Sequence, residues 1–254
     1  MESSTGKPHT SAFAAAEVIS RPEFGPADLL ELLEITRASS REYDALASIA
    51  GRIDEYVGDF DTTDRIFRKS SVDLALGYPR PAIRLLKERE GRIANIIRGR
   101  ACQLLDEHTN AIRYYERALK GVEPLTVEKV LLAQCYVFNR RIDEARKIFE
   151  ALAEGEKQTF QARYLEALLV ELQGDQEKAI DMYDALLAEF PNAPDPLFRK
   201  AVILDQKGDD PKVVEEMYRR LVGKERFYEG AAVNLAIMLR SEERRVGKEC
   251  RSRW

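Results

Sequence analysis

Small residues recur at a nearly fixed interval along most of this chain, and this recurrence constrains the fold more than any other feature. One series follows spacings of 34, 34, 34 and 35 residues and consists of Gly99, Ala133, Ala167, Ala201 and Ala236. A second series runs in step with it and consists of the pairs Ala111/Tyr115, Ala145/Phe149, Ala179/Tyr183 and Val214/Tyr218. Internal repetition with a period of about 20 to 50 residues is typical of solenoids built from stacked, similar units.

One copy, residues 174–191, shows what each unit contains. Its sequence GDQEKAIDMYDALLAEFP opens with a Gly-Asp turn and continues as a helical pattern. Ala179, Tyr183 and Leu186 fall on one face of that helix. The small residue lets a neighbouring helix approach closely, and the ring four residues later fills the space beyond it. Pro191 ends the helix, because the residue before a proline is disfavoured in the helical region.

Both series slip by one residue at the same place. The slip lies between Ala201 and Val214, and the turn Gly208-Asp209-Asp210-Pro211 is the natural site for a single inserted residue. Two independent series that agree on one insertion indicate a real register, which runs from about residue 92 to residue 239.

These residues resemble the tetratricopeptide repeat family. The resemblance consists of the small residue in the first helix of each pair, the glycine turn, the small-aromatic pair and the closing proline at Pro191. No copy carries the tryptophan that the family has in its first helix, and the resemblance is weaker over residues 27–91. It implies an all-α fold, a right-handed α-solenoid of antiparallel helix pairs.

We expect four regions along the chain. Residues 1–22 are expected to be a disordered leader, and residues 23–90 an N-terminal helical region with degenerate repeats. Residues 91–239 are expected to hold about four repeats plus a truncated last helix, on which Leu235 and Leu239 leave apolar surface exposed. Residues 240–254 (RSEERRVGKECRSRW) resemble a translated sequencing adapter and are expected to be a non-native tail.

Composition argues against several classes of function. The formal net charge of −4 is unlike that of a general nucleic-acid binder. Two histidines, His9 and His108, are too few and too far apart for a histidine-based triad or zinc site. Cys102, Cys135 and Cys250 lack CxxC spacing, which favours a reduced, cytoplasmic setting. We therefore expect no catalysis, no cofactor, no metal site and no membrane segment.

Two local motifs have competing interpretations. Residues 59–63 (DFDTT) match the DxDxT pattern of aspartate-nucleophile phosphotransferases, but no strand precedes them, so a helix-cap role is favoured. A basic stretch that includes Arg84, Lys87 and Arg92 could bind an acidic peptide or a phosphate backbone. The stretch lacks aromatic residues that would stack on bases, which favours a solvated helix face.

The resemblance also implies where a partner would bind. In this family the first helices of the pairs line a concave groove, whose corresponding residues here are Arg100, Gln103, Gln134, Val137, Phe138, Tyr164, Glu171, Phe198 and Asp205. The Lys and Asn residues of the family's two-carboxylate clamp are absent. The groove is apolar with a few polar points, which suits an amphipathic helix or an apolar peptide. The alternative is that the chain's own N-terminal helices, or further C-terminal sequence, fill the groove.

Three hypotheses of function follow. The first is a protein–protein interaction scaffold that binds a protein or peptide in the groove and has no catalysis of its own. The second is the N-terminal arm of a larger enzyme, of sulfotransferase or glycosyltransferase type, whose catalytic domain would follow residue 239. The third is an RNA-associated adaptor that uses the basic stretch; nucleic acid is nevertheless the less favoured partner, given the acidic net charge.

Overall fold

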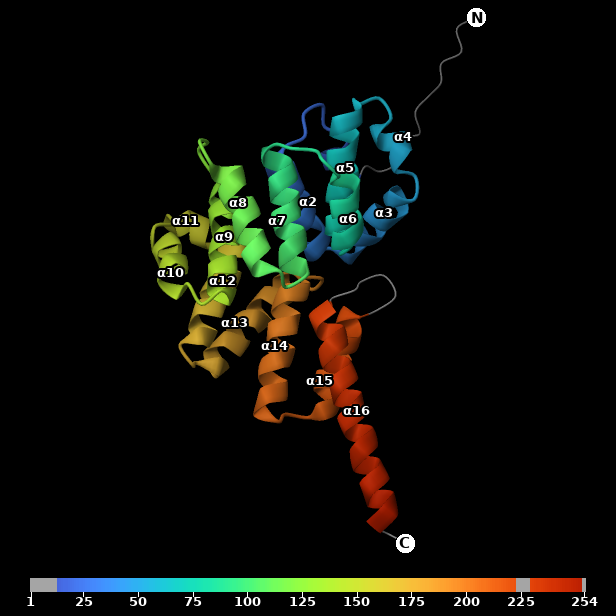
Figure 1. Ribbon diagram of the computed structural model, residues 1–254, viewed down its shortest axis with the longest axis vertical. Coiled ribbons are helices and arrows are strands. Elements are labelled where there is room, and N and C mark those ends of the chain that lie inside the picture. The colour runs from blue at the N-terminus through green and yellow to red at the C-terminus, as the bar shows by residue number, and fades with distance from the viewer. Residues whose placement is uncertain (1–12, 223–228, 253–254) are drawn as a thin grey trace, which may run out of the picture.

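The computed structural model describes residues 13–222 and 229–252, and the side chains of residues 229 and 242–252 lie outside the described part. Within these ranges the secondary structure is helical and contains no strand (Figure 1). The all-α fold class is therefore confirmed. The N-terminal helices are α1 (Ala14–Ile19), α2 (Pro26–Ala38), α3 (Ser40–Ala50), α4 (Ile53–Val57), α5 (Thr62–Ala75) and α6 (Pro79–Leu86).

The remaining helices form the expected pairs, in which consecutive helices pack against one another. The pairs are α7 (Arg92–Leu104) with α8 (His108–Leu119), α9 (Thr126–Phe138) with α10 (Ile142–Glu150), α12 (Phe160–Leu172) with α13 (Gln176–Glu189), and α14 (Pro194–Lys207) with α15 (Pro211–Leu221). A short helix, α11 (Glu154–Lys157), precedes α12, and a long helix, α16 (Glu229–Ser252), follows α15 and projects away from the body (Figure 1). The prediction of a solenoid is confirmed.

The small-aromatic series is a packing device. Tyr115, Tyr183 and Tyr218 of the second helices are fully buried. A Cβ atom added to Gly99 of α7 would lie 2.8 Å from Cε1 of Tyr115, so the ring of α8 rests directly on the backbone of α7. The series thus places the largest side chain of one helix over the smallest residue of its partner, which is how interiors reach close packing.

The predicted turns and caps have the expected geometry. Gly208 adopts a left-handed φ of 72° at the end of α14, where the single insertion was placed. The carboxylate of Asp61 accepts hydrogen bonds from the backbone N–H groups of Thr63 and Asp64, at 2.8 and 3.1 Å. Asp61 therefore caps α5, and the helix-cap interpretation of residues 59–63 is confirmed.

The disorder expected over residues 1–22 does not extend to residues 13–22. Helix α1 buries Ala15, Val18 and Ile19 against the N-terminal helices. The fully buried Arg68 of α5 donates a hydrogen bond to the carbonyl oxygen of Ile19. A six-residue helix has little stability alone. Contacts with distant residues order it, and the local sequence does not indicate those contacts. Residues 1–12 lie outside the described part of the chain.

Helix α2 lies on the inner surface of the solenoid, which the first helices of the pairs form. It contacts α7, and Leu29, Leu30 and Leu33 of α2 belong to the same core as the apolar residues of α7. Near its C-terminus the guanidinium of Arg37 lies 4.9 Å from the centre of the Phe160 ring of α12. The carbonyl oxygen of Arg37 accepts a hydrogen bond from the backbone N–H of Asn192 at 3.0 Å, and the Ser40 and Asn192 side chains meet at 3.1 Å. The N-terminal helices are thus joined to the α13–α14 loop.

Helix α16 is helical through residue 252, beyond the point where the apolar periodicity stops. Leu235 and Leu239 were expected to be exposed, but both are half-buried, and Leu235 packs against the α14–α15 core. The exposed apolar residues are instead Val233 and Ile237, with exposed fractions of 55% and 60%. The first turn of α16 approaches Phe198 closely: a Cβ on Gly230 would lie 3.0 Å from its ring. The non-native origin of residues 240–254 stays a prediction.

Candidate functional site: the concave pocket

Most of the residues predicted to line the groove do meet on the inner surface. A cavity of about 210 Å³ lies between the first helices of the pairs. Six of the nine predicted residues line it, namely Arg100, Gln103, Gln134, Phe138, Tyr164 and Phe198. The other lining residues are Asp106, His108, Asp195 and Arg199, which the resemblance to the repeat family did not predict. We call this cavity the concave pocket.

One part of the lining of the concave pocket consists of buried polar groups that serve the fold. Gln103 and Gln134 are buried, and Gln103 donates a hydrogen bond to the carbonyl oxygen of Leu131 at 3.1 Å. The hydroxyl of Tyr115 donates to Oε1 of Gln103 at 2.6 Å. Gln134 donates to the carbonyl oxygen of Gln161 at 3.0 Å. Because buried polar groups need such partners, these glutamines tie adjacent pairs together rather than face a ligand.

The other end is built from rings that are only half-buried. The His108 imidazole of α8 stacks on the Phe138 ring of α9, with centroids 4.4 Å apart and planes 10° apart. The Arg199 guanidinium of α14 lies 5.8 Å from the centre of the same ring. Phe198 lies on α14 beside the first turn of α16. Nδ1 of His108 is buried and has no hydrogen-bond partner among the described residues. This end therefore offers apolar ring faces together with one buried nitrogen atom, Nδ1 of His108, that has no hydrogen-bond partner among the described residues.

Polar residues border the pocket toward the C-terminal ends of α12 and α14. Glu171 of α12 forms an ion pair with Arg199 and accepts a hydrogen bond from the Tyr183 hydroxyl at 2.7 Å. Burial lowers the pKa of Arg199, but the hydrogen bond to Glu171 outweighs it and the net pKa is raised. Asp205 is exposed. Val137 is buried and does not line the cavity, so the prediction for this residue finds no support in its position.

Helix α2 and the α14 N-terminus bring two buried arginines together at the back of the pocket. Arg100 of α7 contacts Asp195 of α14 at 2.7 Å, and Arg37 of α2 lies 3.9 Å from the same carboxylate oxygen. Burial and then the charge of Arg100 lower the pKa of Arg37 to about 10. Sequence reasoning missed Arg37 and Asp195, because an arginine in the last turn of an amphipathic helix usually faces solvent.

The cysteines and acidic groups offer little reactive chemistry. Cys102 and Cys135 are buried, and burial raises the pKa of each thiol to about 12, so both stay protonated near neutral pH. The Cys250 side chain lies outside the described part.

Among the described residues, no group of three histidine, cysteine or acidic side chains is arranged to hold a metal ion. None of the described helices is long and apolar enough to cross a membrane.

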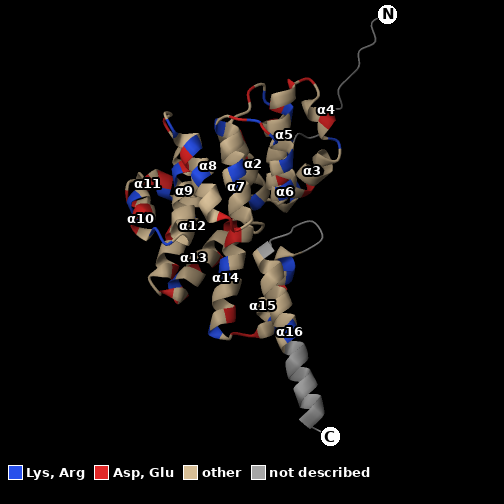
Figure 2. Ribbon diagram, in the orientation of Figure 1, with Lys and Arg blue, Asp and Glu red and all other residues tan. Residues whose placement is uncertain are grey.

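The residues of the predicted basic patch have different surroundings. Arg84 and Lys87 line one shallow cavity with Asp73, but Arg92 forms an ion pair with the fully buried Glu128 of α9. Arg98, from the same stretch, is buried and donates a hydrogen bond to the Lys87 carbonyl oxygen at 2.8 Å. Figure 2 shows basic and acidic residues interspersed over the helices that face the viewer. Part of the basic stretch therefore serves internal contacts.

Asp73 gives a pH-dependent prediction. Burial raises its pKa to about 6, although Arg84 acts in the opposite direction. A carboxyl whose pKa is higher in the folded state stabilises the fold when protonated, and this contribution is lost as the pH rises through 6. Because the side chain is partly exposed, we expect Asp73→Asn to raise the free energy of unfolding at pH 8 by only about 1–2 kcal/mol.

The gain should shrink as the pH is lowered through 6 and should be absent only below about pH 3, where Asp73 is protonated in both the folded and the unfolded state. Urea denaturation at a series of pH values measures it. Asp54→Asn is the control, because the Asp54 carboxylate is exposed and its hydrogen bond to Lys69 lowers its pKa. A gain that does not depend on pH would contradict the assignment.

Comparison with known proteins agrees with this architecture. Residues 130–194, which run from within α9 to the start of α14, match the family model described as tetratricopeptide repeat. No curated protein matches the chain. The match covers the part of the register in which the small-aromatic pairs Ala145/Phe149 and Ala179/Tyr183 fall. The stacked helix pairs, their packing and this match together identify a region similar to tetratricopeptide repeats within this chain.

Proposed function

We propose that this protein is an interaction adaptor that binds a short apolar segment of a partner protein at the half-buried end of the concave pocket. Tetratricopeptide repeats generally mediate protein–protein interactions and typically lack catalysis of their own, which supports an adaptor role in general terms. The stack of His108 on Phe138, with Phe198 lining the same cavity, is the observation that carries the finer proposal.

The dimensions and chemistry of the pocket favour a short segment. Helix α2 lies at the back of the concave pocket, where Arg37 contacts Asp195, so an occupant has the cavity of about 210 Å³ and its border. That space suits one or two anchoring side chains of a peptide, with rings below them and Arg199, Glu171 and Asp106 at the rim. Aromatic anchors in a partly desolvated pocket are where binding energy concentrates in protein interfaces.

A peptide selection tests the proposal. Peptides would be selected from a displayed random library on the full chain, and the affinity of the selected peptides would then be measured by fluorescence anisotropy. We expect Phe138→Glu and Phe198→Glu each to weaken binding about tenfold or more, because a charge replaces an apolar contact. Circular dichroism would verify that each variant stays folded.

The matched control is Arg113→Glu, a charge change at an exposed residue of α8 on a second helix of a pair. Its affinity for the selected peptides should equal that of the unmodified chain. If the selected peptides bind the two phenylalanine variants as tightly as the unmodified chain, the binding surface lies elsewhere and the proposal fails.

A further inference from the structure

A wide, shallow cavity lies between α5 and α6 and shares no lining residue with the concave pocket. It has a volume of about 1190 Å³. The residues that line it come from α5, α6 and the α6–α7 connection, and they are Ile66, Asp73, Pro81, Arg84, Leu85, Lys87, Glu88 and Arg89. We call it the α6 cavity.

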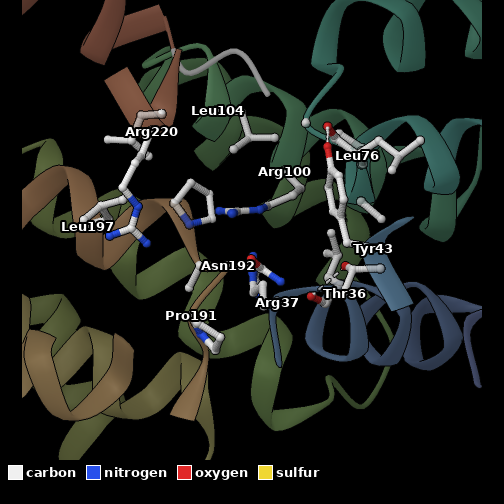
Figure 3. Close-up of a pocket in the computed structure, with 17 residues that line it drawn as sticks. Thr36, Arg37, Tyr43, Leu76, Arg100, Leu104, Pro191, Asn192, Leu197 and Arg220 are labelled. Atoms are coloured by element: carbon white, nitrogen blue, oxygen red, sulfur yellow. Dashed lines mark hydrogen bonds between the residues drawn. The ribbon is translucent and has the colours of Figure 1, made fainter. Parts of the chain in front are cut away.

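The fold divides the basic stretch of the sequence into an inner and an outer part. Residues 80–100 hold seven lysine or arginine residues and only two glutamates, in a chain whose net charge is −4. The inner residues make internal contacts and are Arg92, Arg98 and Arg100. Figure 3 shows Arg100 in the interior, near Arg37 of α2. The outer residues are exposed, line the α6 cavity and are Arg84, Lys87 and Arg89.

The outer basic residues present their charge at the surface. Within the part of the chain that the structure describes, none of their side chains forms an ion pair or a hydrogen bond. Two carboxylates also line the cavity: Glu88 is exposed, whereas Asp73 is half-buried. Burial raises the pKa of Asp73 to about 6, and Arg84 acts on it in the opposite direction. The lining thus has three positive charges against two negative ones, and such a surplus attracts an acidic segment.

The backbone fixes the position of Lys87. Its φ of 45° and ψ of −117°, at the end of α6, lie outside the regions that residues other than glycine usually adopt. The buried Arg98 side chain donates a hydrogen bond to the Lys87 carbonyl oxygen at 2.8 Å and holds this conformation. Strained residues persist only where their surroundings fix them, and they are common at binding sites. A residue that is already fixed loses less entropy when a partner binds.

The remaining lining residues are apolar and half-buried, and they are Ile66, Pro81 and Leu85. They place apolar surface directly beside exposed positive charge. We propose that the α6 cavity binds an acidic segment of a partner protein. One or two apolar side chains of this segment contact the apolar residues, and neighbouring carboxylates face the outer basic residues.

Two features separate this site from other binding modes. The lining holds no aromatic ring on which nucleic-acid bases could stack, and two of its residues are acidic, so a protein segment is favoured over RNA. The site lies apart from the concave pocket, so the proposal is independent of peptide binding there.

Fluorescence anisotropy of the labelled peptide EELLDELE, titrated with the full chain at low salt and pH 7.5, tests the proposal. We expect saturable binding of EELLDELE, and binding of its uncharged counterpart QQLLNQLQ weaker by about tenfold or more. Arg84→Gln and Lys87→Gln should each weaken the binding of EELLDELE about threefold, and the double variant about tenfold, because each removes one exposed charge. Thermal unfolding would verify that the variants stay folded.

Asp73→Asn should act in the opposite direction. At pH 7.5 the Asp73 carboxyl is ionised and repels an acidic peptide, so its replacement should strengthen the binding of EELLDELE about two- to threefold. The same change is expected to stabilise the fold at this pH, so loss of folding cannot account for the result.

The matched control is Arg113→Gln, at an exposed residue of α8 that does not line the α6 cavity. It should bind EELLDELE like the unmodified chain, as should Phe138→Glu, which separates this site from the concave pocket. Absence of saturable binding, equal affinity for QQLLNQLQ, unchanged affinity in a folded Arg84→Gln/Lys87→Gln variant, or weaker binding by Asp73→Asn would overturn the proposal. Tighter binding of a uridine-rich RNA oligonucleotide than of EELLDELE would also overturn it, because the cavity would then be selective for nucleic acid.

Discussion

Replacement of Asp195 by alanine is expected to lower the free energy of unfolding by about 3–5 kcal/mol. Asp195 is buried at the start of α14 and is the carboxylate shared by Arg37 and Arg100. Without it, the buried guanidinium groups of Arg37 and Arg100 lose the carboxylate that both of them contact. Removing one member of a buried ion network leaves uncompensated charge, which is the most costly way to break it.

Chemical denaturation of the variant and of the unmodified chain measures the loss. The control is Asp184→Ala, because Asp184 pairs with Lys200 at 2.5 Å but is half exposed, and an exposed pair contributes less than about 1 kcal/mol. Addition of Arg37→Gln to Asp195→Ala should recover part of the stability, since it removes one of the two charges. A loss for Asp195→Ala that is no larger than the loss for Asp184→Ala would contradict the buried network.

Replacement of Tyr115 by alanine is expected to lower the free energy of unfolding by about 3–5 kcal/mol. The removal of a fully buried aromatic side chain leaves a cavity that the surrounding helices fill only in part. Its ring rests on the backbone of Gly99, and its hydroxyl donates a hydrogen bond to Gln103. Gln103 in turn bonds to Leu131 of the next pair, so the loss should loosen the contact between neighbouring repeats.

Urea denaturation of three variants separates the contributions. Tyr115→Phe keeps the ring and should cost about 1 kcal/mol, the usual contribution of one hydrogen bond. Tyr114→Ala changes the neighbouring tyrosine, which is only half-buried, and should cost clearly less than Tyr115→Ala. Equal losses in the free energy of unfolding for the two alanine variants would show that the rings of the small-aromatic pairs are not the main contributors to the core.

The repeat register was predictable because its signals are local. The pair Ala179/Tyr183 and the turn at Gly208 each lie within one helix or one connection, and the same spacing recurs along the chain. Each unit packs mainly against its neighbours, so a pattern within one unit describes the contacts of the next. The positions of α7 to α15 therefore follow closely from the sequence.

The N-terminal part was less predictable, since its structure depends on contacts between distant residues. Helix α1 is ordered by burial against α2, α3 and the Arg68 side chain, none of which its own sequence reveals. The same holds for Arg37, whose place beside Asp195 depends on how α2 enters the solenoid. The resemblance to the repeat family correctly placed Phe138 and Phe198 in the groove, but it could not show that Arg37 of α2 reaches Phe160 and Asp195 on the first helices of two pairs.

The central claim is that the N-terminal helices are held against the α13–α14 loop, so that α2 occupies the inner surface of the repeats. The Ser40 and Asn192 side chains, which meet at 3.1 Å, report on this contact directly. The most direct measurement is disulfide formation in a Ser40→Cys/Asn192→Cys variant that also carries Cys250→Ser. Non-reducing electrophoresis under mild oxidation would score it, with Ser40→Cys/Lys178→Cys as the control pair.

We predict rapid intramolecular cross-linking of residues 40 and 192 with retained helical structure, and none for the control pair, because Lys178 is an exposed residue of α13 away from the loop. Cross-linking that is absent for residues 40 and 192, or equally fast in the control pair, would contradict the claim that α2 is held in the groove.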